Sequence, residues 1–173
     1  MIYMLLSGLI VNLTHGYLLW SQRHDRKWAI SAHAANDTRS YITYLIAHLS
    51  SAFLYLLFAN EVFVQKFDVH WLFVASIITV SFQILQAVIP SRGKTIVLHG
   101  VLAYGMWTSH LIVGYGALVS LPLSNTIRYL ALPLLICPVL LGIYAYFNKQ
   151  KMYWLQMIVI GSYCLGMVVI ASA

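Results

Sequence analysis

The sequence predicts an all-α polytopic membrane protein, a bundle of six transmembrane helices in a single domain. Two observations from composition favour this class: hydrophobic residues make up 61% of the chain and charged residues only 8%. A soluble domain is about 25% charged, so a compact soluble protein of 173 residues could not cover its surface with so few charges. The third observation is that the charges gather in short segments between long apolar ones, as a bilayer requires.

Each predicted span is long enough to cross the membrane, since a helix needs roughly 20 apolar residues to cross about 30 Å of hydrocarbon. None of them contains an Asp, Glu or Lys, and Arg128 lies only at the end of the fifth. The predicted spans are residues 1–20, 41–58, 70–89, 96–119, 127–147 and 152–171, within a single domain of residues 1–173.

The first span is expected to stay in the membrane rather than to be cleaved as a signal peptide. Signal peptides begin with a basic region and end at a cleavage site of small residues, whereas no Lys or Arg precedes Arg23 here. The second span ends less sharply than the others, because Asn60, Glu61 and Lys66 follow its apolar run.

The last two spans carry proline and cysteine. Pro133 and Pro138 lie inside the fifth span and should kink it, because proline cannot donate a backbone hydrogen bond. Residues 148–151 then form a tight turn to the sixth span. Cys137 and Cys164 both fall in the middle of a span, where free thiols are expected to pack as apolar side chains.

The basic residues indicate how the chain is threaded, because short cytoplasmic loops collect Lys and Arg. Eight of the ten follow the first, third and fifth spans: Arg23, Arg26, Lys27, Arg39, Arg92, Lys94, Lys149 and Lys151. We therefore expect both termini outside a plasma (inner) membrane and the loop of residues 21–40 in the cytoplasm. These cations should attract anionic lipid, and their scatter argues against a nucleic-acid-binding stripe.

Neutral polar side chains inside the spans are the candidates for a binding site, because each needs a hydrogen-bond partner away from water. With a rise of 1.5 Å per residue, seven of them should lie in the cytoplasmic half: Asn12, His15, His48, Gln83, Gln86, His99 and Gln156. Polar clusters in membranes often mark binding sites or pathways. The alternative is that these residues bond one another and only hold the bundle together.

The loop after the first span is expected to cover this pocket. Ser31 is the predicted N-cap of an inward extension of the second span, which would place His33 and Asp37 four residues apart on one helix face. Such a pair either prepares an imidazole for catalysis or metal binding or is an ordinary surface pair. Arg39 belongs to the same basic loop.

Three functions remain open. The leading hypothesis is a non-enzymatic binding, transport or accessory protein that takes a small polar or amphiphilic ligand from the cytoplasmic side, alone or with other membrane subunits. The second is an electron carrier or oxidoreductase with a b-type haem, held by two of His15, His48 and His99. The third is a metal-dependent membrane hydrolase with these candidate residues: His33, Asp37, His48 and His99. Because the chain contains no nucleophile elbow, zinc-protease motif or nucleotide-binding loop, a non-enzymatic role is favoured.

The segment VIPSRGKTIVLHGVLAYGM, residues 88–106, contains Pro90, a short polar turn and then His99 where the fourth span begins. This order resembles a segment of small uncharacterised six-helix membrane protein families. The resemblance covers this segment and the number of helices. It implies the six-span architecture and a role for His99, but no particular activity.

Overall fold

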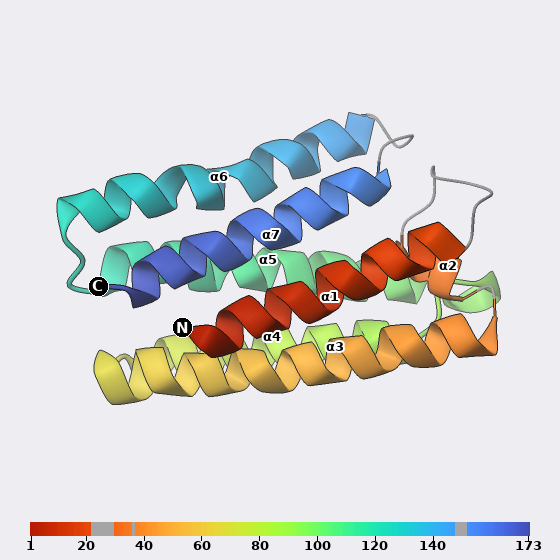
Figure 1. Ribbon diagram of the computed structural model, residues 1–173, viewed down its shortest axis with the longest axis horizontal. Helices are drawn as coiled ribbons and strands as arrows, with labels where there is room; N and C mark the ends of the chain where they lie inside the picture. The colour runs from red at the N-terminus through yellow and green to blue at the C-terminus, as the bar shows by residue number, and fades with distance from the viewer. Residues whose placement is uncertain (22–29, 36, 148–151) are drawn as a thin grey trace.

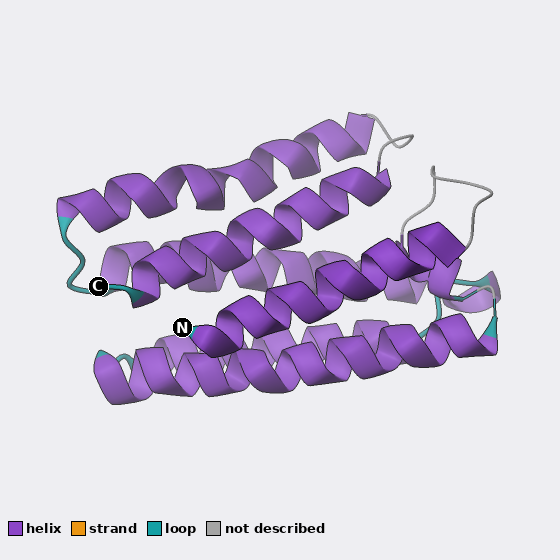
Figure 2. Cartoon of the chain, in the orientation of Figure 1, coloured by secondary structure: helices purple, strands orange, loops and turns teal. Residues whose placement is uncertain are grey.

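The computed structural model describes residues 1–21, 30–35, 37–147 and 152–173, and every regular element in these ranges is helical (Figure 2). Five described segments are long and apolar enough to cross a membrane: α1 (Ile2–Ser21), α3 (Thr38–Ala59) with the π-helix η1 (Asn60–Lys66), α4 (His70–Val88), the 3-10 helix η2 (Gly93–Thr95) with α5 (Ile96–Ser120), and α6 (Asn125–Phe147). By length and composition they make the chain an integral membrane protein. A further long helix, α7 (Met152–Ala171), has a shorter described apolar part, Leu155–Ala171.

The six long helices lie side by side along the long axis of the molecule, and successive ones run in opposite directions (Figure 1). All six long helices contribute residues to a common core, and α6 packs mainly against α7. Both ends of the chain point toward one end of the bundle, and the short helix α2 (Ile30–Ala34) and η2 lie at the other (Figure 1).

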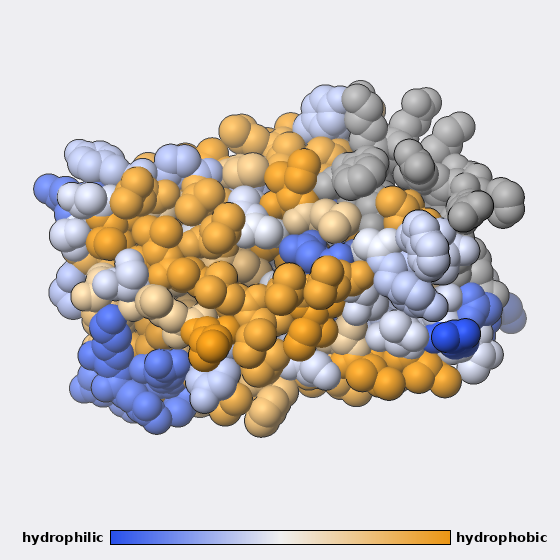
Figure 3. Space-filling model, viewed as in Figure 1, coloured by the Kyte–Doolittle hydropathy of each residue, from blue (hydrophilic) through white to orange (hydrophobic). Residues whose placement is uncertain are grey.

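The outside of the bundle is apolar. Figure 3 shows hydrophobic residues across most of the middle of one face, with a small hydrophilic patch among them and further hydrophilic residues toward the two ends. Large apolar side chains are exposed over this surface, with Val97 at 73% and Val119 at 80%. A soluble protein would leave such contiguous patches only at binding sites, so this surface suits contact with lipid.

The basic residues that the structure describes lie at both ends. Arg39, Arg92 and Lys94 lie at the end that holds α2 and η2, and Lys66 and Arg128 lie at the opposite end (Figure 1). The remaining basic residues lie outside the described ranges: Arg23, Arg26, Lys27, Lys149 and Lys151.

The helix of the second span differs from its prediction at both ends. It begins at Thr38 instead of residue 41, and its α-helical part is continued by η1 as far as Lys66. The polar residues Asn60 and Glu61 therefore do not end the helical rod. They fall where the backbone widens into π-helical geometry, which keeps its hydrogen bonds within the segment.

The predicted helical extension through His33 and Asp37 is wrong. Ser31 lies inside the short helix α2, and the chain leaves helical geometry before Asp37, whose φ and ψ are −144° and 157°. Asp37 is itself the N-cap of α3, because its Oδ1 accepts a hydrogen bond of 2.8 Å from the backbone N–H of Ser40. A carboxylate at this position satisfies an amide that the helix leaves unpaired, so Asp37 starts a helix instead of continuing one.

Candidate functional site

Two helices contribute rows of polar residues to the core. Residues spaced three and four apart share one face of a helix. On α3 the buried row is Tyr44, His48, Ser51 and Tyr55, and on α4 it is Ser76, Thr79, Gln83 and Gln86. The two helices pack directly against each other, so polar groups are concentrated between them.

At the end near α2, Gln86 links three helices. Its Nε2 donates to Tyr44 Oη at 2.7 Å and lies 3.0 Å from His99 Nε2. His99 Nδ1 is 2.6 Å from the carbonyl oxygen of Ile89. Because a carbonyl can only accept, Nδ1 carries the proton, and Nε2 of the neutral ring accepts from Gln86. We call Tyr44, Gln86 and His99 the inner cluster; it joins α3, α4 and α5.

His48 lies next to the inner cluster. Its ring centroid is 4.2 Å from that of Tyr44 and 5.7 Å from that of His15 on α1. Both ring nitrogens of His48 are buried, and neither has a hydrogen-bond partner among the described residues. Since buried polar groups are nearly always paired, this imidazole calls for an explanation.

Gln83 and Ser51 continue the polar region toward the middle of the bundle. Gln83 Nε2 donates to the backbone oxygen of His48 at 3.1 Å and to Ser51 Oγ at 3.3 Å. Ser51 Oγ lies 2.8 Å from Ser7 Oγ of α1. These bonds join α1, α3 and α4 inside the bundle, as interhelical hydrogen bonds do in membrane proteins.

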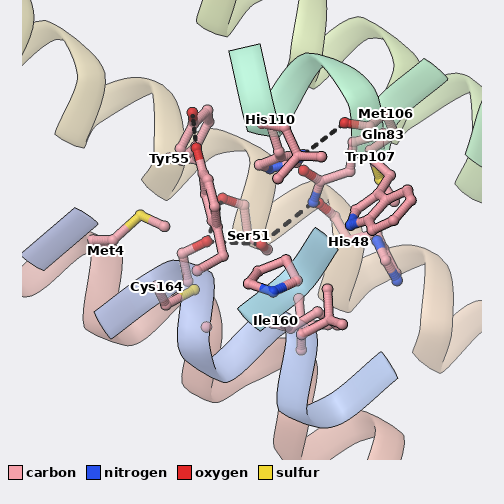
Figure 4. Close-up of a pocket in the computed structure, with 17 residues that line it drawn as sticks. Met4, His48, Ser51, Tyr55, Gln83, Met106, Trp107, His110, Ile160 and Cys164 are labelled. Atoms are coloured by element: carbon pink, nitrogen blue, oxygen red, sulfur yellow. Dashed lines mark hydrogen bonds between the residues drawn. The ribbon is translucent and has the colours of Figure 1, made fainter. Parts of the chain in front are cut away.

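A cavity of about 100 Å³ adjoins these residues. All six long helices contribute to its wall, and most of the wall is apolar. Figure 4 shows His48 and Trp107 on one side of the cavity, Tyr55 and Met4 on the other, and Ser51 and Gln83 between them. Trp107 Nε1 is, like the His48 nitrogens, buried without a hydrogen-bond partner among the described residues.

Aromatic residues form the far side of the cavity. Tyr55 Oη and Tyr163 Oη are 3.0 Å apart, and the ring of His110 lies 5.3 Å from Tyr55 and 4.9 Å from Tyr163 between centroids. His110 Nδ1 is 2.9 Å from the carbonyl of Met106, so it donates and leaves Nε2 as an acceptor. The cavity thus holds donors and acceptors but no charged side chain.

The structure brings five of the predicted pocket residues close together at one level of the bundle: His15, His48, Gln83, Gln86 and His99. Only His48 and Gln83 line the cavity. The other three lie beside it, toward α2, and form the inner cluster or pack against it.

The two remaining predicted pocket residues lie elsewhere. Asn12 is half-buried where α1 meets α7, and its Nδ2 lies 3.9 Å from the position that a Cβ on Gly161 would occupy. Gln156 Oε1 accepts a hydrogen bond of 3.2 Å from the backbone N–H of Ile30 and so anchors the start of α2.

The loop residues are also placed apart from the cavity. Asp37 caps α3, Arg39 is exposed, and Ser31 lies in α2. The side chain of His33 lies outside the described part of the structure. None of the described loop residues lines the cavity.

Seven polar or aromatic residues of the site were not among the predicted ones: Ser7, Tyr44, Ser51, Tyr55, Trp107, His110 and Tyr163. For α3 a signal was present, because positions 44, 48, 51 and 55 follow the spacing of a single helix face. Trp107 and His110 of α5 carried no such signal, because the polar residues of α5 do not gather on one face and its rotation about its own axis cannot be read from the sequence.

The geometry also bears on the haem and metal hypotheses. Both nitrogens of His99 are engaged, so ligation of a haem iron by its Nε2 would break the bond to Gln86. Among the described residues no three His, Cys, Asp or Glu side chains gather in a group that could hold a metal ion. The hydrolase hypothesis also uses His33, whose side chain lies outside the described part.

No family model, no curated protein and no solved structure matches this chain. Function is therefore inferred from the geometry of the cavity and of the inner cluster beside it.

Proposed function

We propose that the chain is a six-span plasma (inner) membrane protein that binds or transports a small neutral amphiphilic molecule inside its helix bundle, alone or as a subunit of a larger assembly. The observation that carries this proposal is His48, a buried imidazole with two unpartnered nitrogens in the wall of an interior cavity. The count of six spans is supported by the length of α7, 20 residues. The external position of both termini is supported by the excess of Lys and Arg in the loops at the other end.

The lining of the cavity restricts the charge of the ligand. No Asp, Glu, Lys or Arg side chain contributes to the wall, and a buried charge without a partner is strongly unfavourable. The ligand is therefore neutral. An amphiphilic ligand fits best, because His48, Ser51 and Gln83 occupy one part of the wall while residues such as Met4, and Ile160 on α7, make the rest apolar.

The size of the cavity restricts the size of the ligand. An engineered protein cavity of about 150 Å³ binds benzene, and the cavity here measures about 100 Å³. The bound part of the ligand is thus no larger than a single ring. Phenol, with one ring and one hydroxyl, stands at the upper limit of this size and combines the apolar and polar groups that the wall offers.

The unpartnered state of His48 favours a binding role over a purely structural one. Leaving a buried polar group unpaired costs about 1–3 kcal/mol, and proteins keep such destabilising groups chiefly where function needs them. In contrast, both ring nitrogens of His99 are engaged, one of them by Gln86 Nε2, although Gln86 Oε1 has no partner among the described residues. The role of this pair is to hold Tyr44 and the adjoining His48 in position. Gln83 and Ser51 orient the ligand.

The proposal is tested by the effect of phenol on the thermal stability of the purified protein in lipid nanodiscs. Phenol should raise the Tm of the native chain, because a molecule that binds only the folded state stabilises it. The variant His48→Leu should have a higher Tm without phenol, since an unpaired polar group is removed, and should lose the increase caused by phenol.

His70→Leu is the matched control, because the side chain of His70 is 69% exposed and lies near Asp68, outside the cavity. It should respond to phenol as the native chain does. An unchanged Tm of the native chain with phenol, or an equal increase in His48→Leu, would contradict the proposal.

A further inference from the structure

We infer that the ligand enters the cavity sideways from the hydrocarbon of the membrane, between α5 and the α6–α7 hairpin, at a mouth covered by Trp107. The ligand class is then a neutral, lipid-soluble molecule instead of a solute of the cytoplasm. This inference rests on the proposed function and adds the route by which the site is reached.

The burial of the lining residues indicates where the cavity comes closest to the surface. Every lining residue from α1, α3, α4 and α6 is buried. The partly exposed lining residues all belong to α5 and α7: Met106, Trp107, His110, Leu111, Val159 and Ile160. The thin part of the wall therefore lies between α5 and α7, on the side that α6 covers.

Packing is weakest along the same side. Helices α6 and α7 pack extensively against each other, whereas α5 makes few contacts with either. Helix α6 also contains Pro133 and Pro138, and each proline removes a backbone hydrogen bond from the helix. The packing between α5 and the α6–α7 hairpin is therefore the sparsest among the neighbouring long helices.

Trp107 forms the barrier at this side. A Cβ added to Gly142 of α6 would lie 1.8 Å from Trp107 Cη2, so the indole rests directly on the α6 backbone. The same side chain lines the cavity and is partly exposed. Its Nε1 is buried and unpartnered among the described residues, so a ligand oxygen could accept a hydrogen bond from it, since Trp can only donate.

The route from the inner end of the bundle is closed by described residues. Ile30 and Ala34 of α2 pack against Leu18 of α1 and Tyr44 of α3, and Tyr44 is in turn bonded to Gln86 of the inner cluster. The opposite half of the bundle is filled by apolar residues such as Phe58 and Phe63, which are fully buried. No described residue of α2, η1 or η2 lines the cavity, so the described part of neither end opens into it.

Cys164 provides a reporter for the route, because it is buried and lines the cavity. The variant Cys137→Ser leaves Cys164 as the only cysteine, since the chain has 2. In liposomes, this variant is treated with a matched pair of thiol reagents, neutral methyl methanethiosulfonate and the charged 2-sulfonatoethyl methanethiosulfonate, the latter on both sides of the membrane. Modification of Cys164 is followed by mass spectrometry.

The neutral reagent should modify Cys164 and the charged reagent should not. Trp107→Ala should accelerate the neutral reaction several-fold by opening the mouth. Trp71→Ala is the matched control, because Trp71 rests on Gly116, where a Cβ would lie 2.3 Å from its ring, and does not line the cavity. If Trp107→Ala prevents folding, Gly142→Ala displaces the same indole, and Gly116→Ala is its control.

Three results would overturn the inference: modification by the charged reagent at a similar rate, equal acceleration by Trp107→Ala and Trp71→Ala, or no modification by either reagent in any variant. None of these results concerns binding itself. Binding is measured by phenol stabilisation, so the failure of the route and the failure of the proposed function are distinguished.

Discussion

Gln83 is hydrogen-bonded to the backbone of His48 but not to the imidazole ring of His48. The amide Nε2 of Gln83 donates to the carbonyl oxygen of His48 at 3.1 Å, while the two ring nitrogens of His48 have no hydrogen-bond partner among the described residues. The main chain at this point is fixed by the neighbouring helix, and the imidazole remains available to a ligand. Pre-organised polar groups of this kind bind with little loss of conformational entropy.

The inner cluster is expected to be the main polar contribution to stability at its end of the bundle. Gln86→Leu would leave Tyr44 Oη and His99 Nε2 without the amide that bonds both. Since each buried group left unpaired costs about 1–3 kcal/mol, the free energy of unfolding should fall by several kcal/mol, measured by denaturation in mild detergent. Ser81→Ala is the control, because Ser81 is exposed and bonds only its own helix; an equal effect of both would refute the prediction.

The approach of α1 to α7 depends on Gly8. A Cβ at this position would lie 2.6 Å from Cys164 Sγ, so Gly8→Ala should destabilise the protein by about 1–3 kcal/mol, as overpacking does. Adding Cys164→Ala should restore much of the loss, because it removes the colliding sulfur. Gly100→Ala meets nothing within 4 Å and should be harmless. Additive effects of the Gly8 and Cys164 substitutions would show that the contact is not the cause.

Arg128 closes the end of α5. Its guanidinium donates to the carbonyl oxygen of Leu118 in the last turn of α5, where helix carbonyls lack intrahelical partners, and to those of Leu121 and Leu123 just beyond the helix. Arg128→Gln should lower the Tm by several degrees, because about 1–3 kcal/mol is lost when charge-assisted bonds to a helix terminus are removed. The control is Lys94→Gln at an exposed position of η2. A Tm for Arg128→Gln equal to that of Lys94→Gln would refute this role.

The proposed threading is tested with reporter fusions. Alkaline phosphatase, which folds only outside the cytoplasm, should be active when fused after Ala173 and inactive when fused after Thr95. A fluorescent reporter that matures only in the cytoplasm should give the opposite result. The expectation follows from the bias of Lys and Arg toward the loops after the first, third and fifth spans; the reversed pattern of activities would invert the topology.

Much of the architecture could be predicted from composition and segment length. The low fraction of charged residues, 8%, excludes a soluble surface, and the long apolar segments give the helices because a backbone in lipid must satisfy its own hydrogen bonds. Their boundaries agree to within a few residues except around the second span. There Asp37 is the N-cap of α3, and Asn60 is the first residue of the π-helix η1, which continues α3.

The position of each polar residue along its span could also be predicted from the sequence, because the rise of a helix per residue is fixed. It identified five residues that the structure brings to one level: His15, His48, Gln83, Gln86 and His99. Depth alone did not separate His48, which lines the cavity, from His99, whose nitrogens are both engaged.

The sequence by itself determined that the surface of this protein suits a membrane, which segments are helical, and where along its helix each polar side chain lies. These properties follow from composition and from local helical geometry. Only the tertiary structure decided which side chains meet, since the rotation of each helix about its axis is set by packing against its neighbours. That rotation placed Trp107 on Gly142 and turned Asn12 toward α7. The cavity beside His48 is a place where the side chains of six packed helices do not fill the space between them.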